Sequence, residues 1–256
     1  MNKPIASSCI GMCAALLAVQ GSNAQQDAAP TPIIEVFGCN FKGNNDIDQW
    51  RSVATRFNAW ADRNNVEGYT AFTMVPYVHS DELTYDVLWL GAYANGEAMG
   101  KGDTLYFSQG ADIEAAFDAI VDCSMHSHYA EVNLREPQGP PPERNGIARF
   151  SDCTLRDGRT VEESIEALGA WSEYLAQNGS DTFAAILFAL AGETSDADYT
   201  FKFVQGFGSM NDYGHYTDVV TRGGFRRADE LMGRLMECDS PRIYLLERIR
   251  LADEGN

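Results

Sequence analysis

Hydrophobic and polar residues alternate in two similar stretches of this chain. Residues 85–93 read YDVLWLGAY, and residues 199–207 read YTFKFVQGF. In both stretches an aromatic or branched residue stands at every second position, which is the period of a β-strand. A Gly-bearing break follows or ends each stretch, and the second begins 114 residues after the first (199 − 85 = 114). The pattern predicts an internal repeat.

The segments around these two strands predict the same order of elements, β-α-β-β-α-β, in each half of the chain. We expect strands in the first half at 33–41, 68–78, 85–93 and 126–134, with helices at 47–64 and 113–121. In the second half we expect strands at 147–154, 182–190, 199–207 and 243–249, with helices at 161–177 and 225–236. The helices are predicted from apolar residues that recur every three or four positions.

Two further segments are rich in Gly, Asn and Tyr, namely 95–103 and 209–218. We expect both to be loops. Loops of this kind either connect elements or close over a pocket as lids.

A β-α-β-β-α-β unit of this size resembles the ferredoxin-like fold. Helices cover only one face of the sheet in such a unit, so the other face must pack against a partner. The second unit provides that partner, and the chain therefore resembles the dimeric α+β barrel superfamily in its fused form, which includes monooxygenases of the antibiotic-biosynthesis type. We expect an α+β protein in which two tandem ferredoxin-like repeats pack their sheets into one α+β barrel, a monomeric pseudo-dimer. Residues 39–42 (CNFK) and 89–92 (WLGA) also resemble exported proteins of marine bacteria.

The first 24 residues have the pattern of a cleavable secretory signal. A start with one charge, Lys3, precedes an apolar stretch at 10–19 and a small-residue exit at 22–24. The alternative is an N-terminus without a targeting role. We expect a flexible lead-in at 25–32, repeats at 33–135 and 147–250, a Pro-rich linker at 136–146 and a tail at 251–256. The protein is accordingly predicted to be exported to a bacterial periplasm or the extracellular space.

Removal of the signal would leave four cysteines, Cys39, Cys123, Cys153 and Cys238. An even number in an exported chain indicates disulfides. Among the three possible pairings, the repeat favours Cys39–Cys123 and Cys153–Cys238, one in each half. In the ferredoxin-like arrangement the first and fourth strands are antiparallel neighbours, which would bring each pair together. The alternative is four unrelated buried thiols.

The chain is acidic, with 37 Asp and Glu against 19 Lys and Arg and a formal net charge of −18. Nucleic-acid binding depends on clustered cations, so we expect no nucleic-acid partner. No segment after the signal is long and apolar enough to span a bilayer, so we expect no membrane span.

His126 and His128 are two residues apart on a predicted strand, so both rings face the same side. Two such rings can hold a metal ion or an iron-bound cofactor. A third ligand would have to come from elsewhere, and the other histidines are His79 and His215. The alternative is a pair of exposed or hydrogen-bonded histidines near the start of a strand.

The aromatic residues of the two central strands could line a ligand cavity between the sheets, since small-molecule sites are mostly apolar with a few polar groups. The candidate residues are Tyr85, Trp89, Tyr93, Tyr199, Phe203 and Phe207, with Glu35, Arg149 and Gln205 as the polar members. The alternative is that these aromatic side chains pack the core under the helices.

Motifs of zinc hydrolases, P-loops, dinucleotide-binding folds and nucleophile elbows are absent from the sequence, so we assign no catalytic residue. We expect a non-catalytic module that binds a small hydrophobic ligand or another protein, with no cofactor. The alternative, implied by the resemblance, is a cofactor-free or haem-linked monooxygenase. A structural scaffold in an envelope assembly is a third hypothesis.

Overall fold

The computed structural model describes residues 30–138, 145–194 and 197–252. The predicted signal peptide at 1–24 lies outside the described residues. So do most of the lead-in, the middle of the Pro-rich linker and the end of the tail. The repeat boundaries at 33–135 and 147–250 therefore stay predictions.

The first half of the described chain consists of β1 (Ile33–Phe41), α1 (Ile47–Arg63), β2 (Tyr69–Val78), β3 (Val87–Tyr93), α2 (Gly96–Gln109), α3 (Ala111–Asp118) and β4 (Val121–Arg135). The second half consists of β5 (Asn145–Leu155), α4 (Val161–Gln177), β6 (Phe183–Ala191), β7 (Phe201–Phe207), α5 (Met210–Val219), a π-helical turn η1 (Val220–Gly224), α6 (Phe225–Met232), β8 (Met236–Cys238) and β9 (Arg242–Arg250). None of the helices in the described ranges is long and apolar enough to cross a membrane.

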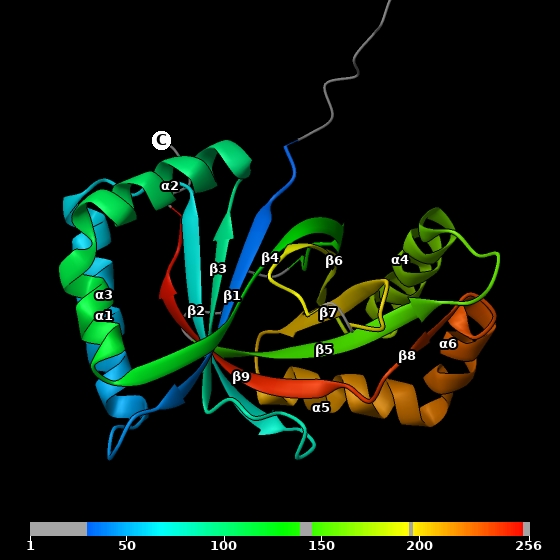
Figure 1. Ribbon diagram of the computed structural model, residues 1–256. Coiled ribbons are helices and arrows are strands. Elements are labelled where there is room, and N and C mark those ends of the chain that lie inside the picture. Colours follow the sequence, from blue (N-terminus) through cyan, green and yellow to red (C-terminus); the bar gives the residue numbers. More distant parts are fainter. Residues whose placement is uncertain (1–29, 139–144, 195–196, 253–256) are drawn as a thin grey trace, which may run out of the picture.

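Eight antiparallel strands close into a barrel (Figure 1). The first half contributes the order β4-β1-β3-β2, and the second half contributes β9-β5-β7-β6. The β2–β9 and β4–β6 pairings join the two halves and close the barrel. The short β8 extends the sheet beside β5. The helices lie outside the barrel, with α1 and α3 against the first half and α4, α5 and α6 around the second. The expected α+β barrel fold is confirmed.

Helix α1 begins where the sequence predicts it. The Asp46 side chain accepts a hydrogen bond from the Asp48 N–H, and the Gln49 side chain accepts one from the Asp46 N–H. This reciprocal capping satisfies backbone donors that would otherwise have no partner. The same arrangement of Thr160 and Glu163 starts α4.

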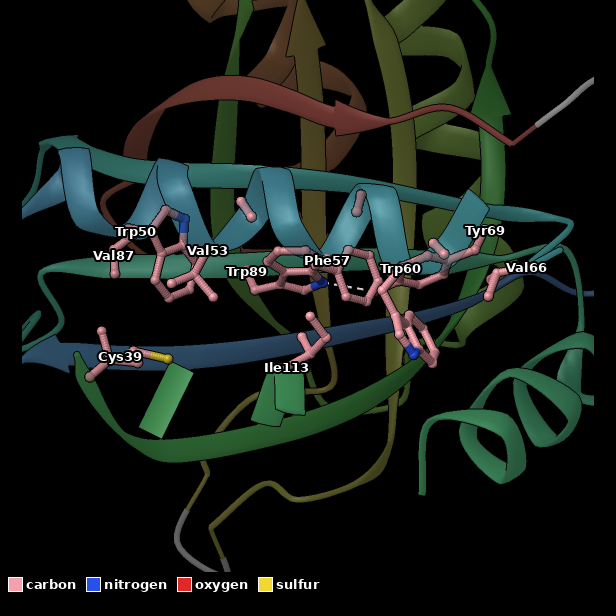
Figure 2. Packing of buried hydrophobic residues seen from close by; sticks show 14 of the residues in the cluster. Cys39, Trp50, Val53, Phe57, Trp60, Val66, Tyr69, Val87, Trp89 and Ile113 are labelled. Atoms are coloured by element: carbon pink, nitrogen blue, oxygen red, sulfur yellow. Dashed lines mark hydrogen bonds between the residues drawn. The ribbon is translucent and has the colours of Figure 1, made fainter. Parts of the chain in front are cut away.

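Three clusters of buried side chains form the core. The first lies between the first-half sheet and its helices, and Figure 2 shows Trp50, Phe57 and Trp89 packed together there. The Trp50 indole donates a hydrogen bond to Thr73 Oγ1 over 2.9 Å. The second cluster has the same position in the second half. The third, which we call the interior cluster, lies between the two sheets: Ile34, Val36, Met74, Leu88, Tyr129, Ala148, Phe150, Leu187, Val204 and Tyr244.

The two Gly-, Asn- and Tyr-rich segments expected to be loops are helices, so that prediction was wrong. Residues 95–103 begin α2, and residues 209–218 form most of α5. The Asn95 side chain accepts from the Ala98 N–H, and the Ser209 side chain accepts from the Asp212 N–H. These N-caps begin two helices that were not predicted, because their sequences are rich in Gly.

Two predicted helix ends were also too late. Helix α3 ends at Asp118, and β4 begins at Val121, which pairs with Phe41. Helix α6 ends at Met232, well before Cys238. Apolar residues in these stretches belong to strand pairing rather than to a helical face, which periodicity in short segments does not separate.

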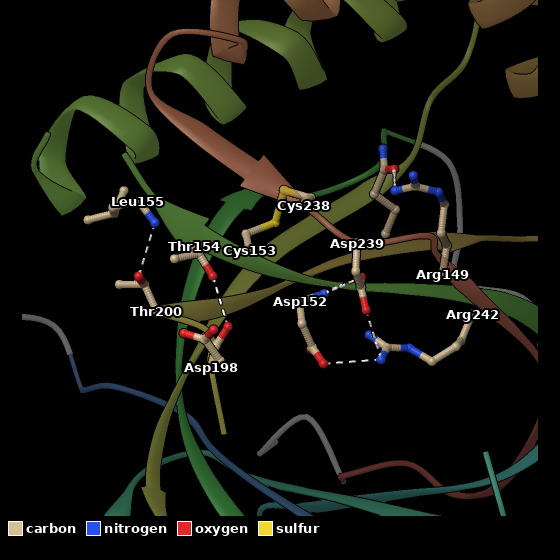
Figure 3. The surroundings of a disulfide bond; sticks show 11 residues. Arg149, Asp152, Cys153, Thr154, Leu155, Asp198, Thr200, Cys238, Asp239 and Arg242 are labelled. Atoms are coloured by element: carbon tan, nitrogen blue, oxygen red, sulfur yellow. Dashed lines mark hydrogen bonds and ion pairs between the residues drawn. A yellow bond between two sulfur atoms is a disulfide. The ribbon is translucent and has the colours of Figure 1, made fainter. Parts of the chain in front are cut away.

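Both predicted disulfides are present. Cys39 is bonded to Cys123 and Cys153 to Cys238, across the β1–β4 and β5–β8 pairings. Figure 3 shows the second bond. The bridges join the strands that the ferredoxin-like order makes neighbours, so the pairing inferred from the spacing is confirmed.

Glu131 on β4 is expected to make the stability of the folded protein depend on pH. Burial, with a smaller contribution from Glu136, raises the pKa of Glu131 to about 7. The folded state therefore favours the protonated acid, so ionisation destabilises the fold as pH rises from about 4.5 to 7. We expect Glu131→Gln to raise the free energy of unfolding by about 2 kcal/mol at pH 8, after allowance for solvent screening, and to leave it unchanged at pH 4. Urea unfolding at the two pH values measures this. The exposed Glu67→Gln variant is the control, and an equal effect of Glu131→Gln at both pH values would contradict the prediction.

Candidate metal centre

Four of the six aromatic residues predicted to line a cavity between the sheets lie on the other side of the sheet, under the helices. Trp89 and Tyr93 belong to the helix-side cluster of the first half. Phe203 and Phe207 belong to the helix-side cluster of the second half. Their expected placement between the sheets was wrong, because the face that is richer in aromatic residues packs under the helices.

Tyr85 and Tyr199 precede β3 and β7 instead of lying in them. Tyr85 packs against the interior cluster with its ring over Gly38. The Tyr199 ring lies 4.1 Å from the Lys202 ammonium. The ten buried side chains of the interior cluster fill the space between the sheets, so the structure offers no apolar cavity there among the residues it describes.

Glu35, Arg149 and Gln205 also face the helices. Ile34 and Val36 point into the interior cluster, so Glu35, which lies between them in β1, points to the opposite side. Arg149 and Gln205 share this orientation in the second half, where they face each other across β5 and β7. The three residues form two separate groups, one in each half.

Glu35 lies beside the histidine pair that the sequence singled out. Across β1 and β4, Glu35 faces His128 and Phe37 faces His126. One ligand atom of each of Glu35, His126 and His128 lies within 4.8 Å of the others. His126 Nε2 is 3.8 Å from Glu35 Oε2. The predicted pair of histidines therefore has a carboxylate as its third potential metal ligand.

Two hydrogen bonds fix the position of the Glu35 carboxylate on the side away from the histidines. Tyr69 donates a hydrogen bond to Glu35 Oε1 over 2.6 Å, and Trp89 Nε1 donates one to the Tyr69 hydroxyl over 2.7 Å. Burial raises the pKa of Tyr69, so the phenol remains a donor at neutral pH. These bonds occupy Oε1 and leave Oε2 directed toward the histidines. Gly91 permits the contact, since a Cβ at this position would collide with Tyr69 and Glu35.

The two histidines are oriented by packing. The His126 ring stacks on Phe37 with centroids 3.8 Å apart and an angle of 13° between the planes. The His126 and His128 rings are nearly perpendicular, with centroids 4.8 Å apart. His128 Nε2 is buried and has no hydrogen-bond partner. A buried nitrogen without a partner is costly, and coordination of a metal ion would satisfy it.

Helix α2 closes one side of the centre. Asp103 accepts a hydrogen bond from the Tyr93 hydroxyl over 3.1 Å. Burial raises the pKa of Asp103, while the Tyr93 hydrogen bond and the nearby histidines act in the opposite direction. His126 is the exposed member of the centre, with 48% of its side chain accessible against 9% for Glu35. The open side of the centre is therefore at His126.

The donor set suits a divalent transition metal. Imidazole and carboxylate ligands bind Zn, Fe, Ni and Cu, and two histidines with one carboxylate leave coordination positions open. Ligand atoms around one such ion lie roughly 3.3 Å apart, given metal–nitrogen distances of about 2.1 Å. The separation of up to 4.8 Å in the centre must therefore shorten by roughly 1.5 Å on binding.

Solved structures with the same architecture support the fold. A provisionally assigned chlorite dismutase aligns with a TM-score of 0.52 at 12% identity, over 88% of this chain and 97% of its own. A provisionally assigned monooxygenase from Lactobacillus acidophilus gives 0.54 at 12% identity, again over 88% and 97%. A dye-decolorizing peroxidase from Bacteroides thetaiotaomicron gives 0.53 at 10% identity, over 88% and 96%. The chain has the α+β barrel fold.

Likeness at this level of identity establishes the fold and not the activity. No protein-family model matches the sequence, and no curated protein matches it. The resemblance to exported proteins of marine bacteria is therefore unsupported.

A haem does not fit the described residues, although the resemblance to monooxygenases implied one as an alternative. A haem needs a slot between a sheet and its helices or between the sheets. In the first half the Trp89 ring contacts those of Trp50, Phe57 and Phe117. In the second half Phe207 contacts Tyr213 and Tyr216. In both halves these ring contacts lie in the layer between the sheet and its helices, where a haem would have to insert, so we derive no chemistry through a haem.

Proposed function

We propose that the protein binds one divalent transition-metal ion through Glu35, His126 and His128 and functions as a metal-dependent oxidoreductase. The observation that carries this proposal is that potential ligand atoms of three residues converge, and that one of these residues, His128, has a buried ring nitrogen without a hydrogen-bond partner. Two histidines and one carboxylate with open positions are the ligand set of non-haem iron oxygenases. The fold shared with provisionally assigned monooxygenases supports an oxidative role over a hydrolytic one.

Each residue has a distinct task in this proposal. Glu35 supplies one anionic oxygen, Oε2, because Tyr69 holds Oε1. His128 supplies its buried Nε2, and His126 closes the set at the exposed side. A bound Fe²⁺ would supply the means to react with dioxygen. The protein would orient the ion and leave its open positions toward solvent and a small organic substrate.

This proposal replaces the non-catalytic module with a hydrophobic cavity, because the interior cluster fills the space between the sheets. We also infer that the protein works outside the cytoplasm. Two disulfides support this, since such bonds persist in oxidising compartments. The proposed substrate is a small molecule, and nucleic acid remains an unexpected partner for so acidic a chain.

Titration of the metal-free mature chain tests the proposal. We expect one equivalent of Co²⁺ or Zn²⁺ to remain bound after gel filtration, and the Co²⁺ form to show visible absorption from nitrogen and oxygen ligands. Failure to retain either ion would overturn the proposal. Oxygen uptake by the Fe²⁺-loaded chain tests the oxidative part separately: a chain that binds iron without consuming dioxygen would refute the oxidoreductase role and keep the metal site.

A further inference from the structure

The second half carries a cation where the first half carries the Glu35 carboxylate. Glu35 in β1 faces Gly91 on β3 and His128 on β4. Arg149, 114 residues later, faces Gln205 on β7 and Ile243 on β9. The corresponding place in the second half therefore has the opposite charge and none of the metal ligands.

Arg149 differs from the other partly buried cations of this half. Lys202 contacts Asp152 and Glu193, and Arg242 contacts Asp152 and Asp239. Arg149 forms no ion pair with any carboxylate of the described residues. Its Nη1 donates to Gln205 Oε1 over 3.0 Å, and its guanidinium lies 5.8 Å from the centre of the Tyr216 ring. Figure 3 shows Arg149 directed away from the network of Asp152, Asp239 and Arg242.

Unsatisfied hydrogen-bond donors surround this cation. The Gln205 side chain is completely buried, and its Nε2 has no acceptor. Because Oε1 accepts from Arg149, the orientation of the amide is fixed and Nε2 points to an empty acceptor position. The hydroxyl of Ser151, which is 1% exposed, also has no partner. Ser151 lies two residues after Arg149 on the same face of β5, and Arg149 faces Gln205 across β5 and β7.

We propose that Arg149, Gln205 and Ser151 form a binding site for a small oxyanion, a carboxylate or a phosphate. An oxyanion accepts hydrogen bonds without needing to donate any, and it would provide an acceptor for all three groups at once. A guanidinium presents parallel N–H donors that match two oxygens of such an anion. The ring of Tyr216 on α5 forms one wall, and the partly exposed Arg149 marks the entrance.

Thermal unfolding and calorimetric titration of the full mature chain test the site, with inorganic phosphate and acetate as separate probes at constant ionic strength. We expect a saturable rise in melting temperature with at least one of them, relative to chloride. Arg149→Gln should weaken binding at least 10-fold. Arg156→Gln, which removes an exposed arginine of the same half, should bind as the wild type does. Preference between the probes identifies the anion as a phosphate or a carboxylate.

Gln205→Glu is the second variant, in case Arg149→Gln does not fold. The new carboxylate would pair with Arg149 and occupy the acceptor position itself. We expect this variant to melt at a higher temperature in anion-free buffer and to lose the response to anions. Absence of any response in the wild type, as expected if buried water satisfies these donors, would overturn the proposal. Retention of the response in either variant would do the same.

Discussion

Replacement of His128 by alanine is expected to lower the affinity of the protein for Co²⁺ and Zn²⁺ by more than about 100-fold, since even the loss of a group that only orients a ligand costs about 10- to 100-fold. His128 supplies the buried nitrogen that has no other partner. Glu35→Gln should have a comparable effect, because it removes the only carboxylate among the three converging groups. Competition with a chromophoric chelator measures both affinities.

A graded series makes this prediction specific. Tyr69→Phe leaves all three ligands and removes only the hydrogen bond to Glu35 Oε1, so we expect a smaller loss of about 10- to 100-fold. His79→Ala removes an exposed histidine whose Nδ1 contacts its neighbour Ser80, and it should leave the affinity unchanged. If His79→Ala weakened binding as much as His128→Ala, the assignment of the centre would fail.

Removal of the Cys39–Cys123 bond by Cys39→Ala/Cys123→Ala is expected to lower the free energy of unfolding by about 4 kcal/mol. The bond joins residues 84 positions apart, and its loss gives the unfolded chain the conformational freedom of that long loop. The corresponding fall in melting temperature is roughly 10 to 15 °C for a chain of this size. Alanine is used because Cys39 is completely buried and a serine hydroxyl there would lack a partner.

The control for this variant is Ser124→Ala, which changes the exposed residue next to Cys123 and should leave stability unchanged. Cys153→Ala/Cys238→Ala should cost a similar amount, since its loop is nearly the same, with a separation of 85. A chain without the first bond that unfolded at the wild-type temperature and urea concentration would contradict the expectation.

Local sequence patterns predicted much of the fold. The alternation in 85–93 and 199–207 located β3 and β7 to within two residues. The Asp46 cap and the apolar positions after it predicted α1, and the spacing of the four cysteines predicted both disulfides. Such signals are readable because each depends on neighbours in sequence or on one repeated interval. Helix α2 was missed because its cap, Asn95, stands in a glycine-rich stretch.

The candidate centre was predictable only in part. His126 and His128 share a face because they are two apart on one strand, and the sequence states this directly. Glu35 is 93 positions before His128 (128 − 35 = 93), and only the β1–β4 pairing makes them neighbours. A charged residue at an alternating position of the apolar stretch 33–41 was the available signal. This signal showed that Glu35 is unusual in its strand, but it did not show which residues lie next to Glu35 in the fold.

The sequence by itself determined the positions of the strands and of helices α1 and α4, which cysteines pair and which side chains share a strand face. The tertiary structure decided which of the two faces meets the helices and which fills the barrel. Both faces are apolar in a closed barrel covered by helices, because each is buried against a different layer. Alternation therefore cannot distinguish them. Closure of the barrel placed Trp89 and Phe203 under the helices, and it brought Glu35 to the histidines and Arg149 to Gln205.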